Sequence, residues 1–426
     1  MKLLMVAAIA LVLSACATFP SSTIFERKGT WTSFQHHENT RMGETVALLH
    51  DGRVLLVGGS LRNRAAVATA EIFDPGQMSW SAAANMPEAL SNPTVTVLAD
   101  GRVLATGGEG TPPDRGSGGP PAKSAMIFDP TTGSWTKVAP MSQAHFFHTA
   151  VQLADGRVMV IGGASAIQGV VADTEILDLH TGAWAAVANP PGGGTGPIAL
   201  VLHDGRVLFT GASFLSPSPP PISLYDPTKN IWTTLDFPAS GFLVASAFET
   251  PDGRIVGFER RYQQTPGGIN DFGGPPPGPV DVFPFVLDVA NGSTKLGSAM
   301  PGGPSSTQFS PSGTESALLQ DGRILTFQST PSRALIYDPA RDSWSVAPTP
   351  PLMQSTRLLT LLSDGRVLRF GGDSFAIFNP NGLVAGPSPA SIGSPELSWW
   401  LTVIAGVMVL LVGIQYAWSR LPQFST

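Results

Sequence analysis

This chain of 426 residues has few charged residues and almost no cysteine. Cys16 is its only cysteine, so no other thiol is present to mispair in an oxidising compartment. Lys, Arg, Asp and Glu make up 13% of the chain, about half the usual share, and the formal net charge is −6. The sequence therefore offers no basic stripe, and we predict that it binds no nucleic acid.

Recognisable catalytic motifs are also missing. The sequence contains no nucleophile elbow and no spaced set of metal ligands, and its glycine-rich pieces lie in proline-rich loops without the following helix that a phosphate-binding loop needs. We therefore predict no catalytic residue, no metal site and no cofactor. Glycine (47) and proline (39) are abundant, but 42% of the chain is hydrophobic and patterned, which indicates turns in a folded domain rather than disorder.

One tripeptide recurs along the chain. Asp-Gly-Arg followed by an apolar strand occurs seven times, 43 to 69 residues apart, at Asp51, Asp100, Asp155, Asp204, Asp252, Asp321 and Asp364. A period of this size indicates an array of similar units. In the clearest unit, "TAVQLADGRVMVIGG", two strands flank Asp155-Gly156 and the second ends at Gly162-Gly163. We expect a hairpin with a type I′ turn, which needs positive φ at both central residues.

Each unit continues with a third strand, a turn and a fourth strand, as in "TEILDLHTGAW". The double glycine, the aromatic-Asp-Pro turn and the tryptophan resemble the kelch motif over residues 29–380. The resemblance implies an all-β fold, a β-propeller of four-stranded blades in which these residues pack the core. The matching residues are Gly58-Gly59, Gly107-Gly108, Gly162-Gly163 and Gly371-Gly372, the turns at Phe73, Phe128, Tyr225 and Tyr337, and Trp80, Trp135, Trp184, Trp232 and Trp344.

The two ends of the repeat region complete each other. "GTWTSF" around Trp31 reads as a fourth strand without a blade, and the last unit has three strands but no tryptophan of its own. We predict that Trp31 supplies the outer strand of the blade that begins at Arg357, which makes seven blades and removes two free sheet edges. The fifth unit lacks both the double glycine and the tryptophan, and we expect "VFPFVLDV" as its third strand.

The amino-terminal end resembles a bacterial lipoprotein signal over residues 1–16. An apolar stretch is followed by Leu13-Ser14-Ala15 and then Cys16, which would carry the lipid. An ordinary secretory signal and an uncleaved signal anchor remain alternatives. Residues 17–28 then form a linker to the propeller.

The carboxyl-terminal end contains a second membrane signal. Residues 397–418 carry no charge, are long enough to cross a bilayer and have aromatic residues at both ends, so we predict a transmembrane helix. Residues 381–396 form its linker, and residues 419–426 are a cytoplasmic tail. Single helices belong in an inner membrane, so we expect a bacterial inner or plasma membrane, with the propeller on the periplasmic or extracellular side.

Loop lengths distinguish the two faces of the predicted ring. The Asp-Gly-Arg turns and the connections from Asp-Pro to Trp are short and open on one face, the turn face. The other connections are long and variable and open on the opposite face, the long-loop face, where we expect a partner to bind. The candidate binding residues there are Arg62, Arg115, His148, Arg260, Arg261, Tyr262 and Arg357.

Four of these candidates carry more specific predictions. Arg260-Arg261-Tyr262 replaces the glycine pair of the fifth unit, and arginine and tyrosine suit acidic groups and rings; a solvated loop is the alternative. His148 reads as a strand-end hydrogen-bonding residue, and its spacing from His145 on an extended segment places the two side chains on opposite faces. Both chain ends leave the propeller on the turn face, which would direct the long-loop face away from the membrane.

We predict a membrane-anchored, extracytoplasmic binding scaffold whose partner is a protein, peptide or glycan. The alternative is an enzyme. The propeller also resembles copper-radical galactose and glyoxal oxidases, but their crosslinked cysteine and second tyrosine have no match here. A resemblance to kelch sialic-acid epimerases implies a channel site that Arg41, Glu44, His148, Arg260 and Arg357 could form.

Overall fold

The computed structural model describes most of the repeat region and neither end of the chain. The predicted lipid-bearing Cys16 and the predicted transmembrane segment 397–418 lie outside the described residues. Among the residues described, no helix is long and apolar enough to cross a membrane. The described ranges are 29–35, 41–61, 64–113, 119–165, 169–170, 173–192, 195–212, 221–235, 242–262, 280–301, 316–329, 332–348, 358–371 and 374–381.

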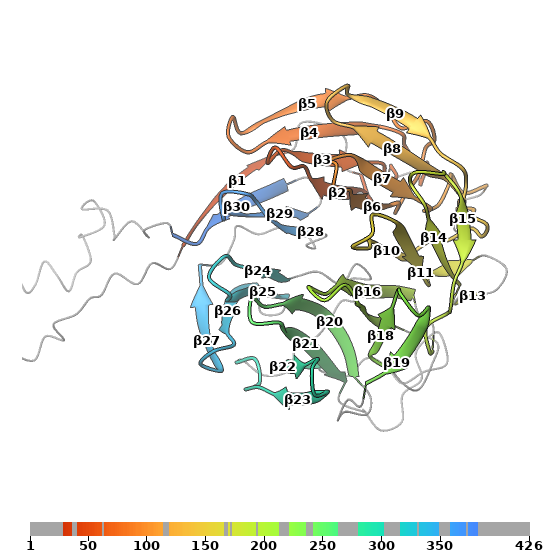
Figure 1. Cartoon of the computed structure of the whole chain (residues 1–426). Coiled ribbons are helices and arrows are strands. Elements are labelled where there is room, and N and C mark those ends of the chain that lie inside the picture. Colours follow the sequence, from red (N-terminus) through yellow and green to blue (C-terminus); the bar gives the residue numbers. More distant parts are fainter. Residues whose placement is uncertain are drawn as a thin grey trace, which may run out of the picture. The chain divides into compact units, whose positions relative to one another are not determined.

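Seven four-stranded antiparallel sheets form the blades of a ring (Figure 1). Blades 1 to 3 are β2 (Thr45–Leu48), β3 (Val54–Val57), β4 (Ala70–Asp74) and β5 (Ser79–Ala83); β6 (Thr94–Val97), β7 (Val103–Thr106), β8 (Ala125–Asp129) and β9 (Ser134–Lys137); and β10 (Thr149–Gln152), β11 (Val158–Ile161), β14 (Thr174–Leu177) and β15 (Trp184–Ala186). Blades 4 and 5 are β16 (Thr195–Val201), β17 (Val207–Ala212), β18 (Ser223–Asp226) and β19 (Ile231–Thr234); and β20 (Phe242–Glu249), β21 (Arg254–Tyr262), β22 (Val280–Asp288) and β23 (Ser293–Leu296). Blade 6 is β24 (Ser316–Leu318), β25 (Ile324–Ser329), β26 (Ser332–Asp338) and β27 (Ser343–Ala347). A separate two-stranded sheet of β12 (Ala164–Ser165) and β13 (Gly169–Val170) lies between β11 and β14 in the chain. The expected seven-bladed all-β propeller is confirmed.

The seventh blade combines the two ends of the repeat region. It contains β28 (Leu358–Leu361), β29 (Val367–Gly371), β30 (Ser374–Asn379) and, as its outermost strand, β1 (Thr30–Gln35). Thr30 pairs with Asn379 and Trp31 with Phe378, so the predicted closure by the amino-terminal strand is confirmed. Because Thr30 and Asn379 lie at the turn-face end of their strands, the chain enters and leaves the ring on that face.

The Asp-Gly-Arg turns differ from the expected type. Positive φ occurs at the glycine of every turn, between +80° and +88°, but at none of the aspartates. Gly52 N–H donates to the carbonyl of Leu49 at 2.9 Å, and Leu49 N–H donates to that of Arg53 at 2.8 Å. This is a three-residue loop, a type I turn followed by a left-handed glycine, and the expected type I′ turn is wrong. The longer loop lets the Asp51 carboxylate accept the amide of Arg53, two residues on, at 3.0 Å.

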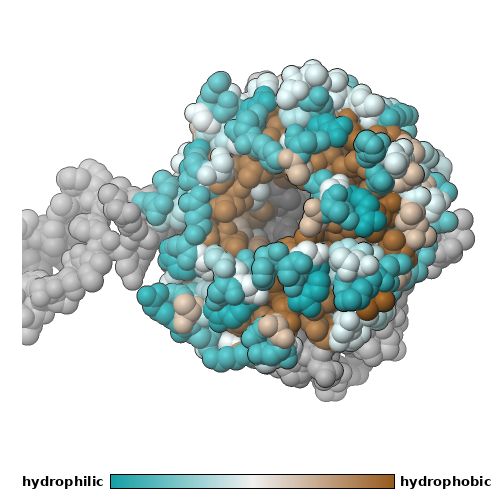
Figure 2. Space-filling view, viewed as in Figure 1, coloured by the Kyte–Doolittle hydropathy of each residue, from teal (hydrophilic) through white to brown (hydrophobic). Residues whose placement is uncertain are grey.

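The core lies between neighbouring blades. In the part of the chain that the structure describes, the buried apolar residues form seven clusters, each shared by two adjacent blades. Val54 and Phe73 of blade 1, for example, pack with Leu368 and Ile377 of blade 7. Hydrophobic residues line the hollow at the centre of the ring, and more hydrophilic residues cover the surrounding face (Figure 2).

Tryptophans of the outermost strands link blades 2, 3, 4, 6 and 7 to the blade before each of them. Trp135 packs on Phe128 with ring centroids 5.1 Å apart and donates its indole N–H to the carbonyl of Ala84, just beyond blade 1, at 2.8 Å. Trp184, Trp232 and Trp344 repeat this contact in later blades. Trp31, on the strand that completes blade 7, makes the same contact: its indole N–H donates to the carbonyl of Pro348, just beyond blade 6, at 2.7 Å.

The glycine pairs meet the segment that leads into the next blade. Gly107 and Gly108 have φ of +56° and +96°, which favours glycine. A Cβ on Gly107 would lie 2.4 Å from the carbonyl oxygen of His145 and 2.5 Å from Cε1 of His148. The absence of a side chain at Gly107 therefore allows the segment that enters blade 3 to approach closely.

The fifth blade departs from the others as predicted, and its third strand, β22, contains "VFPFVLD". Thr294 takes the register position of the tryptophan, opposite Leu287. Its hydroxyl oxygen is buried and has no hydrogen-bond partner among the described residues.

We predict that Trp31→Ala lowers the free energy of unfolding by about 2–4 kcal/mol, because it removes a large, partly buried ring and an inter-blade hydrogen bond. Denaturant titration measures this loss. Trp135→Ala in the continuous blade 2 is the control. Only the Trp31 variant should also speed amide hydrogen exchange along β30, and equal exchange in both variants would contradict a special role of Trp31 in closure.

Candidate functional site

The turn face repeats one ion pair in every blade. In each turn the aspartate pairs with the arginine two residues later, as Asp100 does with Nη2 of Arg102 at 2.7 Å. Hydrogen bonds from the Arg102 side chain lower the pKa of Asp100. These pairs are largely exposed, so each stabilises the fold little. The same contact occurs at Asp51–Arg53, Asp155–Arg157, Asp204–Arg206, Asp252–Arg254, Asp321–Arg323 and Asp364–Arg366.

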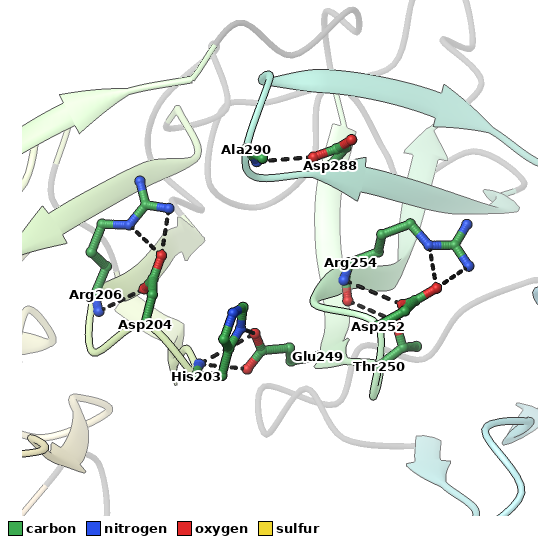
Figure 3. Close-up of polar contacts among 9 residues, drawn as sticks. All are labelled: His203, Asp204, Arg206, Glu249, Thr250, Asp252, Arg254, Asp288 and Ala290. Carbon is green, nitrogen blue, oxygen red and sulfur yellow. Dashed lines mark hydrogen bonds and ion pairs between the residues drawn. The ribbon is translucent and has the colours of Figure 1, made fainter.

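A cavity of about 590 Å³ opens among the turns of blades 4 to 7. His203 and Glu249 lie at its edge and face each other (Figure 3). Nδ1 of His203 lies 2.5 Å from Oε1 of Glu249, and the backbone N–H of His203 donates to Oε2 at 2.9 Å. The hydrogen bond with Glu249 raises the pKa of His203. Leu318, Leu361 and Pro251 add apolar surface to the lining.

A buried polar cluster surrounds His145 and His148 at the entry to blade 3. His145 is fully buried, its Nδ1 lies 2.9 Å from the carbonyl of Gly162, and its Nε2 lies 3.6 Å from Oε1 of Glu175. Nε2 of His148 lies 2.9 Å from the hydroxyl of Thr106. The expected strand-end hydrogen bond of His148 is thus confirmed.

The expectation that the two histidines lie on opposite faces is wrong. Phe147 between them has a φ of +53°, which turns the chain, and the two rings lie with their centroids 5.9 Å apart. Burial lowers the pKa of His148 to about 3, and the neighbouring His145 adds to the effect. Burial alone would raise the pKa of Glu175, but the nearby imidazole of His145 and hydrogen bonds from the backbone N–H groups of Ser142 and Gln143 lower it to about 2.

The contact between His145 and Glu175 has a counterpart in blade 1, between Arg41 and Glu71. Arg41 and His145 both lie ten residues before the aspartate of their turns. Arg41 is buried, donates to the hydroxyl of Thr69 at 2.6 Å and pairs with Glu71, which occupies the place of Glu175 on the third strand. Because the contact recurs, it supports the fold. Arg41 and His148, two residues of the epimerase alternative, are thus 7% and 6% exposed and engaged in structural contacts.

The structure describes only some of the other predicted binding residues. Arg62, Arg115 and Arg357 lie outside the described residues. Arg260, Arg261 and Tyr262 lie at the end of β21, which continues as a strand where blades 1 to 3 turn at the glycine pair. Arg260 is opposite Leu243 on one side and Val282 on the other.

Three acidic residues were missed at the sequence level. Glu175 and Glu259 are 2% and 0% exposed, and Glu259 takes the place of the first glycine of the pair. Glu249 lies three residues before Asp252, where the other units carry apolar residues or Gln152. An alignment of the seven units on their Asp-Gly-Arg turns would have exposed this difference.

Three comparisons place the chain among known proteins. A family model of the kelch motif matches residues 92–142, which span blade 2. Kelch-like protein 25 of Xenopus tropicalis is 29% identical over 128 residues, 28% of this chain, and the match covers only 21% of that relative. A fungal alcohol oxidase solved in complex with copper is similar in structure, with a TM-score of 0.59 and 14% identity over 83% of this chain and 76% of the oxidase.

These observations define a seven-bladed β-propeller whose second blade matches the kelch motif. The likeness to the oxidase shows a shared fold.

The described residues of this chain form no site for a copper ion such as that oxidase binds. Tyr225 and Tyr337 pack on Trp232 and Trp344 and donate their hydroxyls to Asn230 and Asp342, each at 2.9 Å. Across the described ranges, no three His, Cys, Asp or Glu side chains gather in a way that could hold a metal ion.

Acid should destabilise the propeller through the buried cluster. The unfolded chain binds a proton at His148 below pH 6.5, whereas the folded chain does so only near pH 3, so stability falls across this window by up to about 1.4 kcal/mol per pH unit. Glu175 adds a second loss as the pH falls from 4.5 toward 2. Denaturant titrations from pH 7.5 to 4.5 should show a flatter profile for His148→Gln than for the wild type. Identical slopes would contradict the assignment.

Proposed function

We propose that this protein is a membrane-anchored kelch propeller that binds a partner on the extracytoplasmic side through its long-loop face. One observation carries the proposal: the turn face repeats the same ion pair in every blade, whereas at the long-loop end blades 1 to 3 turn at a glycine pair and blade 5 continues as β21. Contacts that recur in every blade serve the fold. Residues that occur once are available to recognise a partner.

The described long-loop face is held in place by its backbone. Met42 and Ser60 exchange hydrogen bonds of 2.8 and 2.7 Å beyond the end of blade 1, and Ser91 and Glu109 exchange two of 2.8 Å beyond blade 2. These bridges extend the blades toward the face. A surface held this way loses little conformational freedom when a partner binds, which favours affinity.

Side chains on these bridges combine apolar and polar character. Met42 is 52% exposed, although it is a large apolar residue. Glu109 accepts a hydrogen bond from the amide of Asn92 at 3.3 Å, and burial raises its pKa. An apolar group beside polar ones is typical of a protein interface.

The straight continuation of β21 supports a recognition role of the fifth blade. Glu259 to Tyr262 extend the strand where blades 1 to 3 turn at a glycine pair. Arg260, Arg261 and Tyr262 are therefore at the long-loop end of the strand. Arginine binds carboxylates in a bidentate way, and arginine and tyrosine are enriched among residues that dominate binding energies.

The chain ends support the anchoring part of the proposal. The sequence around Cys16 and the uncharged segment 397–418 suit a lipid anchor and a transmembrane helix. The chain enters the ring at Thr30 and leaves it at Asn379, both at the turn-face end of blade 7. The linkers reach at most about 40 and 55 Å when extended. Both anchors in one membrane would therefore hold the turn face toward it and leave the long-loop face outward.

We expect Arg260→Ala with Arg261→Ala to weaken partner binding at least about tenfold. The measurement is capture of binding proteins and glycans from envelope extracts by the immobilised full chain. Arg102→Ala with Arg157→Ala removes two arginines from the turn face and should leave the capture unchanged. Equal loss in both double variants, at unchanged thermal stability, would contradict a binding face made by the long loops.

We also expect the chain to incorporate an alkyne-tagged fatty acid when it is made in bacteria, and Cys16→Ser to abolish the label, because the thiol is the acceptor. Fluorescent detection of the tag after gel separation measures this. Label in the Cys16 variant, or none in the wild type, would refute lipidation at this residue.

A further inference from the structure

Glu249 interrupts the regularity of the turn face. At the equivalent inner-strand positions the chain has Leu48, Val97, Gln152, Val201, Leu318 and Leu361. The side chain of Glu249 is only 16% exposed, yet it borders the cavity of about 590 Å³ among the turns of blades 4 to 7. A carboxylate in an otherwise apolar position costs desolvation energy, so its presence calls for a compensating cation.

The charges around Glu249 are incompletely balanced. The nearby aspartates are each paired with an arginine of their own turn: Asp204 with Arg206 and Asp252 with Arg254, both at 2.6 Å. Among the described side chains, the charged partner of Glu249 is His203, and that imidazole is 72% exposed. When His203 is neutral, the cavity edge therefore carries one uncompensated negative charge.

The walls of the cavity suit an alkyl chain. Leu318, Leu361 and Pro251 line it together with the carboxylate and with Gln320, whose amide oxygen is a neutral acceptor. A ligand that fits has an apolar stem and a cationic end, because the stem covers the leucines while the charge reaches Glu249.

We propose that this cavity binds the side chain of a lysine from a partner polypeptide, with the ammonium group against Glu249 and the methylene stem against Leu318 and Leu361. The site lies on the turn face and is separate from the long-loop surface of the proposed function. It gives the propeller a second point of attachment.

Lysine fits this geometry better than arginine or a short amine. The backbone N–H of His203 already lies 3.2 and 2.9 Å from the two oxygens of Glu249. A planar guanidinium needs both oxygens for bidentate pairing, whereas an ammonium is a compact charge that needs one. An ethanolamine headgroup carries the same ammonium group but has no stem long enough to cover the leucines.

Protons compete with the lysine at this site. Protonated His203 supplies the cation that Glu249 lacks, and the ammonium must replace it. The other charged groups near His203 are Asp204 and Arg206 on its own turn and Asp252 and Arg254 on the next, and these two pairs are internally balanced. Lysine binding therefore releases a proton, and the affinity falls up to tenfold per pH unit below the pKa of His203.

The test uses N-acetyl-lysine methylamide and the full chain labelled on its histidine rings, with NMR titration of the His203 signal. We expect saturable binding with a millimolar dissociation constant at pH 8.5 that is at least about tenfold weaker at pH 5.5. Glu249→Gln should weaken binding at pH 8.5 by at least about tenfold. Glu88→Gln, which removes a surface carboxylate paired with Lys137 elsewhere on the ring, should not.

A second variant separates charge recognition from damage to the fold. The His203→Asn variant should still bind the lysine probe, but its affinity should no longer depend on pH. Binding to this variant is measured through the NMR shifts of the leucine methyl groups in the cavity. N-acetyl-norleucine methylamide and O-phosphoethanolamine complete the series. Three results would each overturn the proposal. They are binding of the norleucine probe as strong as that of the lysine probe, a preference of the site for phosphoethanolamine, and no shift with the lysine probe at about 50 mM, which is about 50 times a dissociation constant of about 1 mM.

Discussion

The packing of each four-stranded sheet against the next holds the molecule together. Every buried apolar cluster of the described chain belongs to two blades, so no blade has a core of its own. The strand β1 completes blade 7, and its Trp31 packs on Phe327 of blade 6 and Phe378 of blade 7, at the interface between these two blades. If that strand leaves, β30 becomes a free edge and Phe378 loses its cover. The closed ring, and with it the arrangement of both faces, therefore depends on the pairing of β1 with β30.

The repeat also organises the polar residues. Contacts found in several blades, such as the Asp–Arg pairs of the turns or the buried pairs at Glu71 and Glu175, support the fold. The exceptions gather in the fifth blade. There Glu259 replaces a glycine, Thr294 stands in the place of a tryptophan, and Glu249 replaces an apolar residue. One blade thus gives up standard packing contacts and carries residues that the other blades lack at both ends of its strands.

The fold could be predicted because its determinants are local and repeated. The turns, glycine pairs and tryptophans give the blade count, and the unpaired strand at Trp31 gives the closure. Finer features could not be predicted because they depend on single backbone angles or on distant contacts. The left-handed turn at Phe147 brings His145 and His148 together against the expectation from strand spacing. His203 and Glu249 are 46 residues apart and meet only because neighbouring blades place their turns side by side.

The pairing of Thr30 with Asn379 has a consequence for how the protein is made. A ribosome adds roughly 5–20 residues per second, so the strand that completes the last sheet is synthesised tens of seconds before its partner exists. During that interval the nascent chain carries an exposed Trp31 strand at one end and a growing arc of unsealed sheets at the other. A β-arc with two open edges can pair with a second nascent chain as readily as with its own start. Keeping that early strand apart from other chains until translation ends would prevent such pairing.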